Sequence, residues 1–301
     1  MLYSDKLRLI NYRLHFELSL NHATFDYMCN QFAKYEGAMK ILWVLFCLFC
    51  CNALAFTELK PEPITVGEVF TIPSKVLNEN RRVSVYLPRT YARNTDKSYD
   101  VLYVLDGPAN LLHAAGSQLF LAGYRQMPEL IIVGLHNTNR DRDFTPSEVE
   151  SIPGSGGADN FRTFISEELI PLVNKHYRTT DKKYLSGHSY GGLFALDTLS
   201  KTPNLFDAYF TFSPSLRWDN DLVLQQLIKE LPSSQFNGYL YANIGDEGFK
   251  LKRPILQLHE ALKKLSTNKF RWHVDWLPEE NHSTTPVIGQ FLAYRDYFDR
   301  D

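Results

Sequence analysis

The stretch Gly187-His-Ser-Tyr-Gly-Gly192 decides the fold class of this chain. It fits the pattern Gly-x-Ser-x-Gly, with Ser189 at its centre. The pattern is typical of a nucleophile elbow, a sharp turn from a strand into a helix that holds a serine in strained backbone. Small residues two positions before and after the serine let the strand and the helix approach closely. The hydroxyl then stands at a helix N-terminus, which favours developing negative charge.

The residues on either side of this motif supply the structural context that it requires. Residues 183–185 predict a short strand before the serine, and residues 192–199 predict a helix after it. Such flanks make a common pattern specific, because the elbow is defined by its strand-turn-helix setting. The alternative is a glycine-rich turn between a strand and a helix that carries no chemistry.

Outward from the elbow, short apolar runs alternate with helical patterns from Glu68 to the C-terminus. Several runs are almost continuously apolar, as expected for strands that are covered on both faces. The alternation predicts an α/β fold with a mostly parallel sheet and helices on both faces. The predicted strands are 82–87, 101–105, 130–135, 183–185, 208–212, 239–244 and 270–277, and the predicted helices are 160–177, 192–199, 222–231, 255–265 and 287–298.

The N-terminal residues read as a targeting segment. Met39-Lys40 precedes an apolar run that ends in Ala53-Leu-Ala55, which predicts a secretory signal peptide over 39–55. The run is shorter than the about 20 apolar residues of an ordinary membrane span. We therefore expect a spurious or disordered extension over 1–38, one catalytic domain over 56–301, and a periplasmic or secreted protein. An uncleaved anchor is the alternative. All four cysteines lie in the first 51 residues, so the mature chain would have none.

Composition narrows the classes of partner. The chain has 301 residues, 32 basic and 34 acidic side chains, and a formal net charge of −2. This balance does not resemble the basic surface of a nucleic-acid-binding protein. The sequence has no polybasic segment that would hold the protein at a membrane. We therefore expect stable membrane association only if the signal peptide stays uncleaved. Metal-binding and nucleotide-binding motifs are also missing from the sequence, so we expect no metal and no cofactor.

An activated serine needs a base, and the base needs an acid that orients it. Three histidines follow Ser189, and only His282 lies in a loop, between the last predicted strand and the last predicted helix. That loop can hang an imidazole over the strand ends where the elbow opens. The acid should follow the penultimate strand, where Asp246 and Glu247 stand side by side. We prefer Glu247 as the acid, with Asp246 as the alternative.

The remaining site residues are donors and pocket walls. One oxyanion donor is expected to be the backbone N–H of Tyr190, the residue after the nucleophile. The other should come from loop 105–110, and because Pro108 has no N–H, it must be Gly107 or Ala109. The polar loop 137–160 is expected to be a lid or binding loop at the rim of the site. Substrate-contacting candidates, some of which can equally be core or rim residues, are Trp218, Phe144 and Arg142.

Five elements together resemble a known family. They are Tyr103-Val-Leu-Asp-Gly107, the elbow, Phe212-Ser-Pro-Ser215, Gly245-Asp-Glu247 and His282. In this order they resemble the putative esterase family of α/β-superfamily hydrolases, which is related to the enterobactin and salmochelin esterases. The resemblance implies an eight-stranded α/β-hydrolase core and ester cleavage through an acyl-enzyme. It also implies a triad of Ser189, Glu247 and His282.

The resemblance does not imply siderophore specificity. Those esterases handle large anionic ligands, and the cations that could receive one are scattered in this sequence, at Arg140, Arg142, Arg217 and Lys252. The function predicted from the sequence is hydrolysis of a small-molecule carboxylic ester. The alternatives are a siderophore-ester hydrolase, an acyltransferase on the same triad, and a non-catalytic binding protein on a hydrolase scaffold.

Overall fold

The computed structural model describes residues 37, 41–42, 61–265 and 270–298. Residues 65–301 form one compact unit. The extension and signal peptide expected over 1–38 and 39–55 lie almost wholly outside the described residues. Among the residues that are described, no helix combines the length and the hydropathy needed to cross a bilayer.

Eight strands form a single sheet in the order β1-β2-β4-β3-β5-β6-β7-β8. The first two strands are antiparallel to their neighbours, and all other neighbouring pairs are parallel. This is the α/β-hydrolase fold that the sequence predicts. The strands are β1 (Glu68–Ser74), β2 (Glu79–Tyr86), β3 (Tyr99–Val104), β4 (Ile131–Leu135), β5 (Thr179–His188), β6 (Ala208–Phe212), β7 (Tyr239–Gly245) and β8 (Arg271–Leu277).

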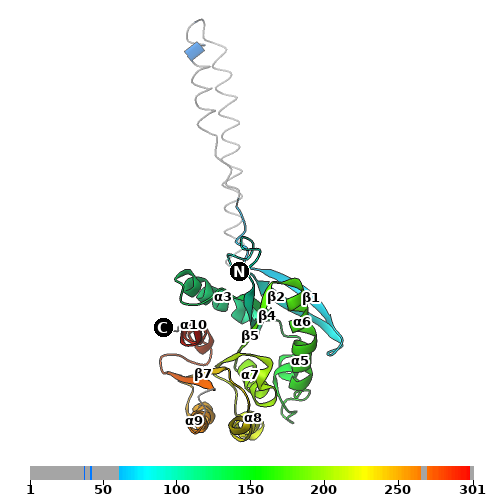
Figure 1. Cartoon of the computed structure of the whole chain (residues 1–301), viewed down its shortest axis with the longest axis vertical. Helices are drawn as coiled ribbons and strands as arrows, with labels where there is room; N and C mark the ends of the chain where they lie inside the picture. The colour runs from blue at the N-terminus through cyan, green and yellow to red at the C-terminus, as the bar shows by residue number, and fades with distance from the viewer. Residues whose placement is uncertain (1–36, 38–40, 43–60, 266–269, 299–301) are drawn as a thin grey trace. The chain divides into compact units, whose positions relative to one another are not determined.

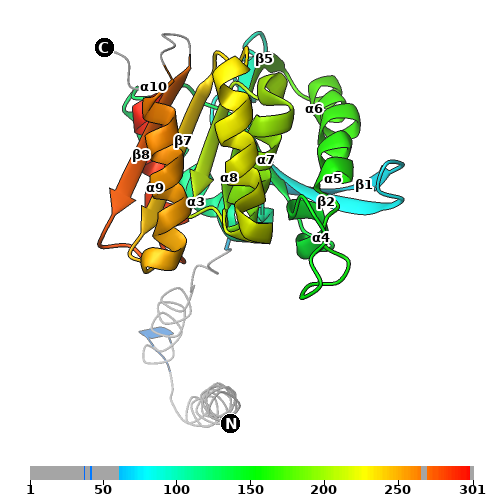
Figure 2. The same cartoon turned by 90° about the horizontal axis from the view of Figure 1, so that it is seen from below.

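Helices cover both faces of the sheet (Figures 1 and 2). Helices α3 and α10 lie together on one face, and the larger set from α5 to α9 lies on the other. Each face has its own apolar core, which removes both sides of the central strands from water. The helices are α3 (Gly107–Gly123), α4 (Arg140–Phe144), α5 (Ala158–Phe164), α6 (Ile170–His176), α7 (Tyr190–Lys201), α8 (Trp218–Glu230), α9 (Phe249–Lys263) and α10 (Thr285–Phe298).

The helix predicted over 160–177 has an interruption that periodicity did not reveal. It consists of α5, a π-helical turn at Ile165–Leu169, and α6, whose second residue is Pro171. Because proline has no N–H, it fits at the start of a helical segment. Helix α3 has no counterpart among the predicted helices. Its start, Asp106-Gly-Pro108, resembles a turn in sequence, but a proline near the helix start is also a helix-initiating signal.

The loop expected over 137–160 is tied to the body of the protein. It contains α4 and a bridge between Val149 and Ile152 before α5 begins at Ala158. Asp143 of α4 forms a 2.7 Å ion pair with Arg81 of β2, and both side chains are 1% exposed. Breaking such a buried pair leaves an uncompensated charge, which is strongly unfavourable. This pair anchors the start of the loop beside the sheet.

Candidate active site

Ser189 occupies the sharp turn between β5 and α7. Its backbone has φ 57° and ψ −114°, a conformation that an L-residue rarely adopts. The approach of strand and helix is so close that a Cβ on Gly187 would lie 2.3 Å from the carbonyl oxygen of Gly191. Only glycine fits at that position. The elbow geometry expected from the sequence is therefore present, with the serine at its apex.

His282 lies in the turn between β8 and α10 and faces this serine. Its Nε2 is 3.0 Å from Ser189 Oγ, and its Nδ1 is 2.6 Å from Glu247 Oε2. The ring of His188, the last residue of β5, packs beside the His282 ring, with ring centroids 4.7 Å apart. His188 Nε2–H donates a 2.6 Å hydrogen bond to the backbone carbonyl of His282. Both the side chain and the backbone of His282 are thus fixed.

The two adjacent carboxylates after β7 have different surroundings. Glu247 is 3% exposed and bonded to His282, whereas Asp246 is 70% exposed and pairs with Lys252 at 2.6 Å. Burial disfavours the charged form of Glu247. Hydrogen bonds from His282, Ser213 and the Gly245 N–H outweigh that effect, so the pKa of the Glu247 carboxyl lies below its usual value. The structure brings Glu247, not Asp246, to the imidazole.

The Ser-Pro-Ser turn after β6 connects the two ends of this arrangement. Ser213 has φ 40°, and its hydroxyl hydrogen-bonds to Glu247 Oε1 and lies 2.8 Å from Thr285 Oγ1. The Ser215 hydroxyl lies 3.2 Å from Ser189 Oγ. The sequence predicts no role for these two serines, whose turn carries only the family resemblance. The available signal was their position directly after the predicted strand 208–212, at the end of the sheet where the elbow also lies.

The expected oxyanion donors differ in availability. The Ala109 N–H donates to the carbonyl of Asp106 at 2.9 Å within the first turn of α3, which leaves Gly107 as the donor of that loop. A Cβ on Gly107 would lie 2.5 Å from the backbone of Gly134, so glycine is required there. Gly107 and Tyr190 are each the first residue of a helix, where N–H groups have no partner in the helix. Among the described residues, neither N–H donates to a protein acceptor.

The predicted substrate-contacting residues mostly lie elsewhere. Phe144 is fully buried and packs against Phe161 and Phe194, because its apolar ring completes the core under α7. Arg142 is held by Glu79 and Asp143 rather than by any triad residue. Only Trp218 adjoins the elbow, with its ring 5.3 Å from that of Tyr190 in an edge-to-face contact.

The four cations named from the sequence have different surroundings. Arg142 is paired as described above, whereas Arg217 is exposed and has no ion pair within the described residues. Arg140 reaches the elbow, but its guanidinium is bonded to the Asp106 carboxylate. Lys252 is paired with Asp246. Within 61–265 and 270–298, no group of three or more His, Cys, Asp or Glu side chains is arranged to hold a metal ion.

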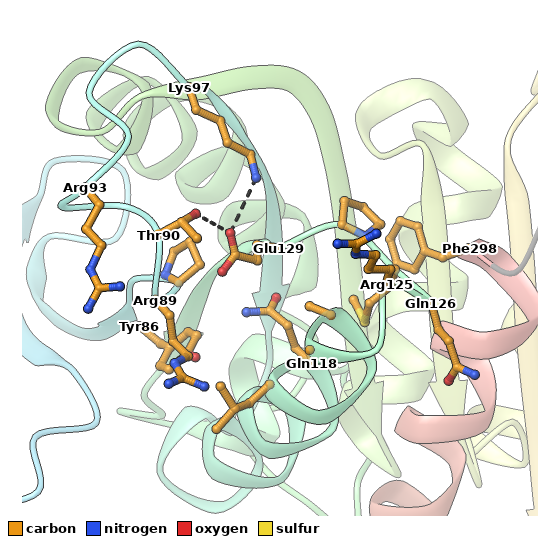
Figure 3. Close-up of a pocket in the computed structure, with 16 residues that line it drawn as sticks. Tyr86, Arg89, Thr90, Arg93, Lys97, Gln118, Arg125, Gln126, Glu129 and Phe298 are labelled. Carbon is orange, nitrogen blue, oxygen red and sulfur yellow. Dashed lines mark hydrogen bonds and ion pairs between the residues drawn. The ribbon is translucent and has the colours of Figure 1, made fainter.

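A cavity of about 820 Å³ lies at the opposite edge of the sheet (Figure 3). It adjoins the end of antiparallel β2 and the segments just before β3 and β4, whereas the elbow follows the end of β5, which runs parallel to β3. Arg89, Arg93, Lys97 and Arg125 surround Glu129 there (Figure 3). No histidine, serine or cysteine is among its described lining residues. Its lining therefore contains no serine–histidine pair like that of the elbow.

The fold is that of the α/β hydrolases, and the hydrogen-bonded series of Ser189, His282 and Glu247 has the geometry of a serine-hydrolase triad. The family model described as "Putative esterase" matches residues 74–285, and the chain belongs to that family. The match includes the elbow, the Ser-Pro-Ser turn and His282.

Among curated relatives, the chain is 30% identical over 190 residues to the ferri-bacillibactin esterase BesA of Bacillus subtilis, covering 53% of this chain and 65% of that protein. It is 34% identical over 171 residues to the siderophore enterobactin esterase of Emericella nidulans, covering 48% and 56%. The matched region thus spans less than two thirds of each of these relatives.

Solved structures give the same grouping. An IroE-like serine hydrolase from Shewanella oneidensis is 32% identical with a TM-score of 0.73, covering 77% of this chain and 80% of that one. The BES protein from Bacillus cereus is 31% identical with a TM-score of 0.72, covering 81% and 99%.

Proposed function

We propose that this protein is a serine esterase that hydrolyses small-molecule carboxylic esters through an acyl-enzyme on Ser189. The observation that carries the proposal is the unbroken hydrogen-bond chain from Ser189 Oγ through His282 to Glu247. Glu247 and Ser189 lie 35 and 93 positions before His282 in the chain, yet the three side chains meet at one edge of the sheet. Membership of the esterase family supports the same reaction.

In the acylation step, Ser189 Oγ attacks the ester carbonyl while His282 Nε2 accepts the hydroxyl proton. Glu247 accepts the hydrogen bond from His282 Nδ1–H and stabilises the imidazolium that forms. The tetrahedral intermediate collapses when His282 returns the proton to the leaving alcohol. The alcohol departs, and the acyl group remains bound to Ser189.

In the deacylation step, His282 removes a proton from water, and the hydroxide attacks the acyl carbonyl. Collapse of the second tetrahedral intermediate breaks the bond to Ser189 Oγ, which regains its proton from His282. The carboxylic acid leaves and the resting enzyme is restored. In both steps, the N–H groups of Gly107 and Tyr190 donate to the oxyanion, because preorganised donors stabilise the charge that develops there.

For the substrate, siderophore esters are the first class to test, because several relatives bear the names of siderophore esterases. The site itself argues for testing neutral esters beside them. Arg140, whose guanidinium donates to the backbone carbonyl of His188 beside the serine, is already neutralised by Asp106. Of the four cations considered, Arg217 alone has no ion pair within the described residues, and it lies two residues after Ser215, so it is the cation that would support preference for an anionic ligand.

The test is a panel of p-nitrophenyl esters of increasing acyl length, together with a cyclic siderophore triester, assayed on wild type and on Ser189→Ala. We expect wild-type turnover of at least one ester and none above background for the variant. Equal rates for the two proteins would overturn the proposal. Product analysis with added alcohols separates hydrolysis from acyl transfer, since a transferase would form a new ester.

We also propose that the protein is exported and that residues 39–55 are removed as a signal peptide. The small-x-small sequence Ala53-Leu-Ala55 supports this. N-terminal sequencing of protein secreted from its native host should begin at Phe56. A first residue before Met39 would contradict the proposal.

A further inference from the structure

Arg140 makes contacts with two separate segments of the active site. From the start of α4, its Nε donates to Asp106 Oδ1 at 2.8 Å and its Nη2 donates to Asp106 Oδ2 at 3.0 Å. The same Nη2 donates to the backbone carbonyl of His188 at 3.3 Å. One planar guanidinium therefore joins the loop after β3 to the last residue of β5.

These two segments carry the two expected oxyanion donors. Asp106 immediately precedes Gly107, and His188 is separated from Tyr190 only by the nucleophile. The segments already lie against each other, because a Cβ on Gly191 would be 3.3 Å from Leu105 Cβ and 3.5 Å from Asp106 Oδ2. Arg140 thus binds Asp106, directly before the donor Gly107, and His188, two residues before the donor Tyr190, at the point where the two segments meet.

The Asp106 backbone is in a conformation that needs such support. It is left-handed, with φ 54°, and it forms the N-cap of α3 without bonding the helix through its side chain. Its carboxylate, 12% exposed, instead accepts from Arg140 and from Asn137 Nδ2. The orientation of the next peptide, which contains the Gly107 N–H, depends on this residue staying in place.

The shape of the guanidinium suits this position. A bidentate Arg–carboxylate pair fixes direction as well as distance, which a lysine ammonium does not. The Arg140 guanidinium also lies 5.2 Å from the ring centroid of Tyr190, so it packs on the side chain of the second donor residue. Arg142, two residues on in the same short helix, has no contact of this kind and is bonded to Glu79 and Asp143.

We propose that Arg140 is a positioning residue of the oxyanion hole, which sets the distance and orientation between the Gly107 and Tyr190 N–H groups by bridging Asp106 and His188. This inference rests on the proposed esterase function. The physical reason is that oxyanion stabilisation depends on donors fixed before the charge develops. Within the described residues, Arg140 has no hydrogen bond to the Ser189 side chain, so it would act through the donor segments.

The experiment compares Arg140→Ala and Arg140→Lys with the matched control Arg142→Ala, in which Asp143 keeps its pair with Arg81. The substrate is a neutral p-nitrophenyl ester, so that charge attraction does not contribute to binding. For both Arg140 variants we expect kcat to fall by about 10- to 100-fold, less than the about 10²- to 10³-fold loss that follows complete removal of one oxyanion donor. KM should stay within about threefold, because the ground-state carbonyl gains little from the donors.

A trifluoromethyl ketone supplies a readout that a general loss of structure would not produce. It forms a tetrahedral adduct with the serine whose oxygen occupies the oxyanion hole. Its Ki should rise in the Arg140 variants by the same factor as kcat/KM falls, and should be unchanged in Arg142→Ala. The melting temperature of each variant is measured beside it.

Three results would overturn the positioning role. The first is unchanged kcat in folded Arg140→Ala. The second is full activity in Arg140→Lys, which would mean that charge alone matters. The third is a rise in KM without loss of kcat, which would make Arg140 a substrate contact.

If Arg140→Ala does not fold, Asp106→Asn replaces it. That variant and Arg140→Lys should then reduce kcat non-additively, and additive losses would count against the bridge. An inactive wild type would remove the proposed function itself, whereas an active wild type with unaffected Arg140 variants would remove only this inference.

Discussion

The two edges of the sheet show opposite uses of polar side chains. The carboxyl edge is the side of the sheet where the parallel strands end, and the amino edge is the side where they begin. At the carboxyl edge, His282 is hydrogen-bonded to both Ser189 and Glu247, and the surrounding backbone is strained at Ser189 and Ser213. At the amino edge, exposed cations surround the cavity of about 820 Å³ in Figure 3. Within the described part of the chain, the side chains of Arg89, Arg93 and Arg125 have neither an ion pair nor a hydrogen bond, whereas Lys97 pairs with Glu129.

The difference teaches that a hollow does not by itself locate chemistry. Helix α3 ends at Gly123, two residues before Arg125, and α10 ends at Phe298 in the cavity wall. Cations near helix C-termini are favourable because they offset the partial negative charge there. The amino edge therefore has an ordinary structural explanation. The carboxyl edge differs, because the strained backbone at Ser189 and Ser213 costs stability and such strain clusters at functional sites.

The largest expected effect tests the difference between the two edges of the sheet directly. Ser189→Ala should lower kcat for a reactive ester by on the order of 10⁴-fold or more, because it removes the nucleophile. Arg89→Ala, at the other edge, should leave kcat unchanged. Steady-state assays of the two variants check this, and a loss of activity in Arg89→Ala alone would move the chemistry to the cavity.

A second comparison lies within the carboxyl edge, between neighbouring carboxylates. Glu247→Gln should lower kcat by about 10³-fold, since an amide beside His282 Nδ1 favours the wrong tautomer and does not stabilise the imidazolium. Asp246→Asn removes only an exposed pair with Lys252 and should change kcat by less than twofold, as exposed ion pairs contribute little. Equal losses in the two variants would refute the assignment of the acid.

The smallest expected effect concerns acid stability. Burial, followed by the nearby charge of another histidine, lowers the pKa of both His113 and His188 to about 4. The unfolded state binds a proton near pH 6.5 that the folded state resists, so stability falls as pH drops from 6.5 toward 4. At pH 5 this costs about 2 kcal/mol for each histidine. His188 is the last residue of β5, at the carboxyl edge, and its charge acts on His113, so this sensitivity belongs to that edge.

Urea unfolding at pH 7 and pH 5 tests this for His113→Gln, whose amide can keep the contact with Asn110 Oδ1. The variant should lose less stability between the two pH values than wild type does. An identical loss in both proteins would show that His113 titrates normally.

Much of this site could be predicted because it depends on local patterns. The elbow needs small residues around a serine, and Gly187 is confirmed as a position where a Cβ would clash. Strand β6 has the predicted bounds, since its apolar residues stand between clear turns. Chain order indicated His282 and narrowed the acid to two neighbours.

The remainder depended on contacts between distant residues. The choice of Glu247 follows from a 2.6 Å contact with a residue 35 positions away, which no spacing encodes. Phe144 and Arg142 were predicted at the substrate, but their polarity and size gave no indication of which way α4 faces. Arg140, two residues before Arg142, is the one that reaches the elbow. Which of the two arginines reaches the elbow depends on the orientation of the short helix α4, and the sequence does not show that orientation.

The most direct test of the account is covalent labelling. Wild-type protein is treated with a fluorophosphonate, and the modified peptide is identified by mass spectrometry. The account predicts one adduct, on Ser189, which disappears in Ser189→Ala and forms much more slowly in His282→Gln. Labelling of another residue, or labelling that persists in Ser189→Ala, would contradict it.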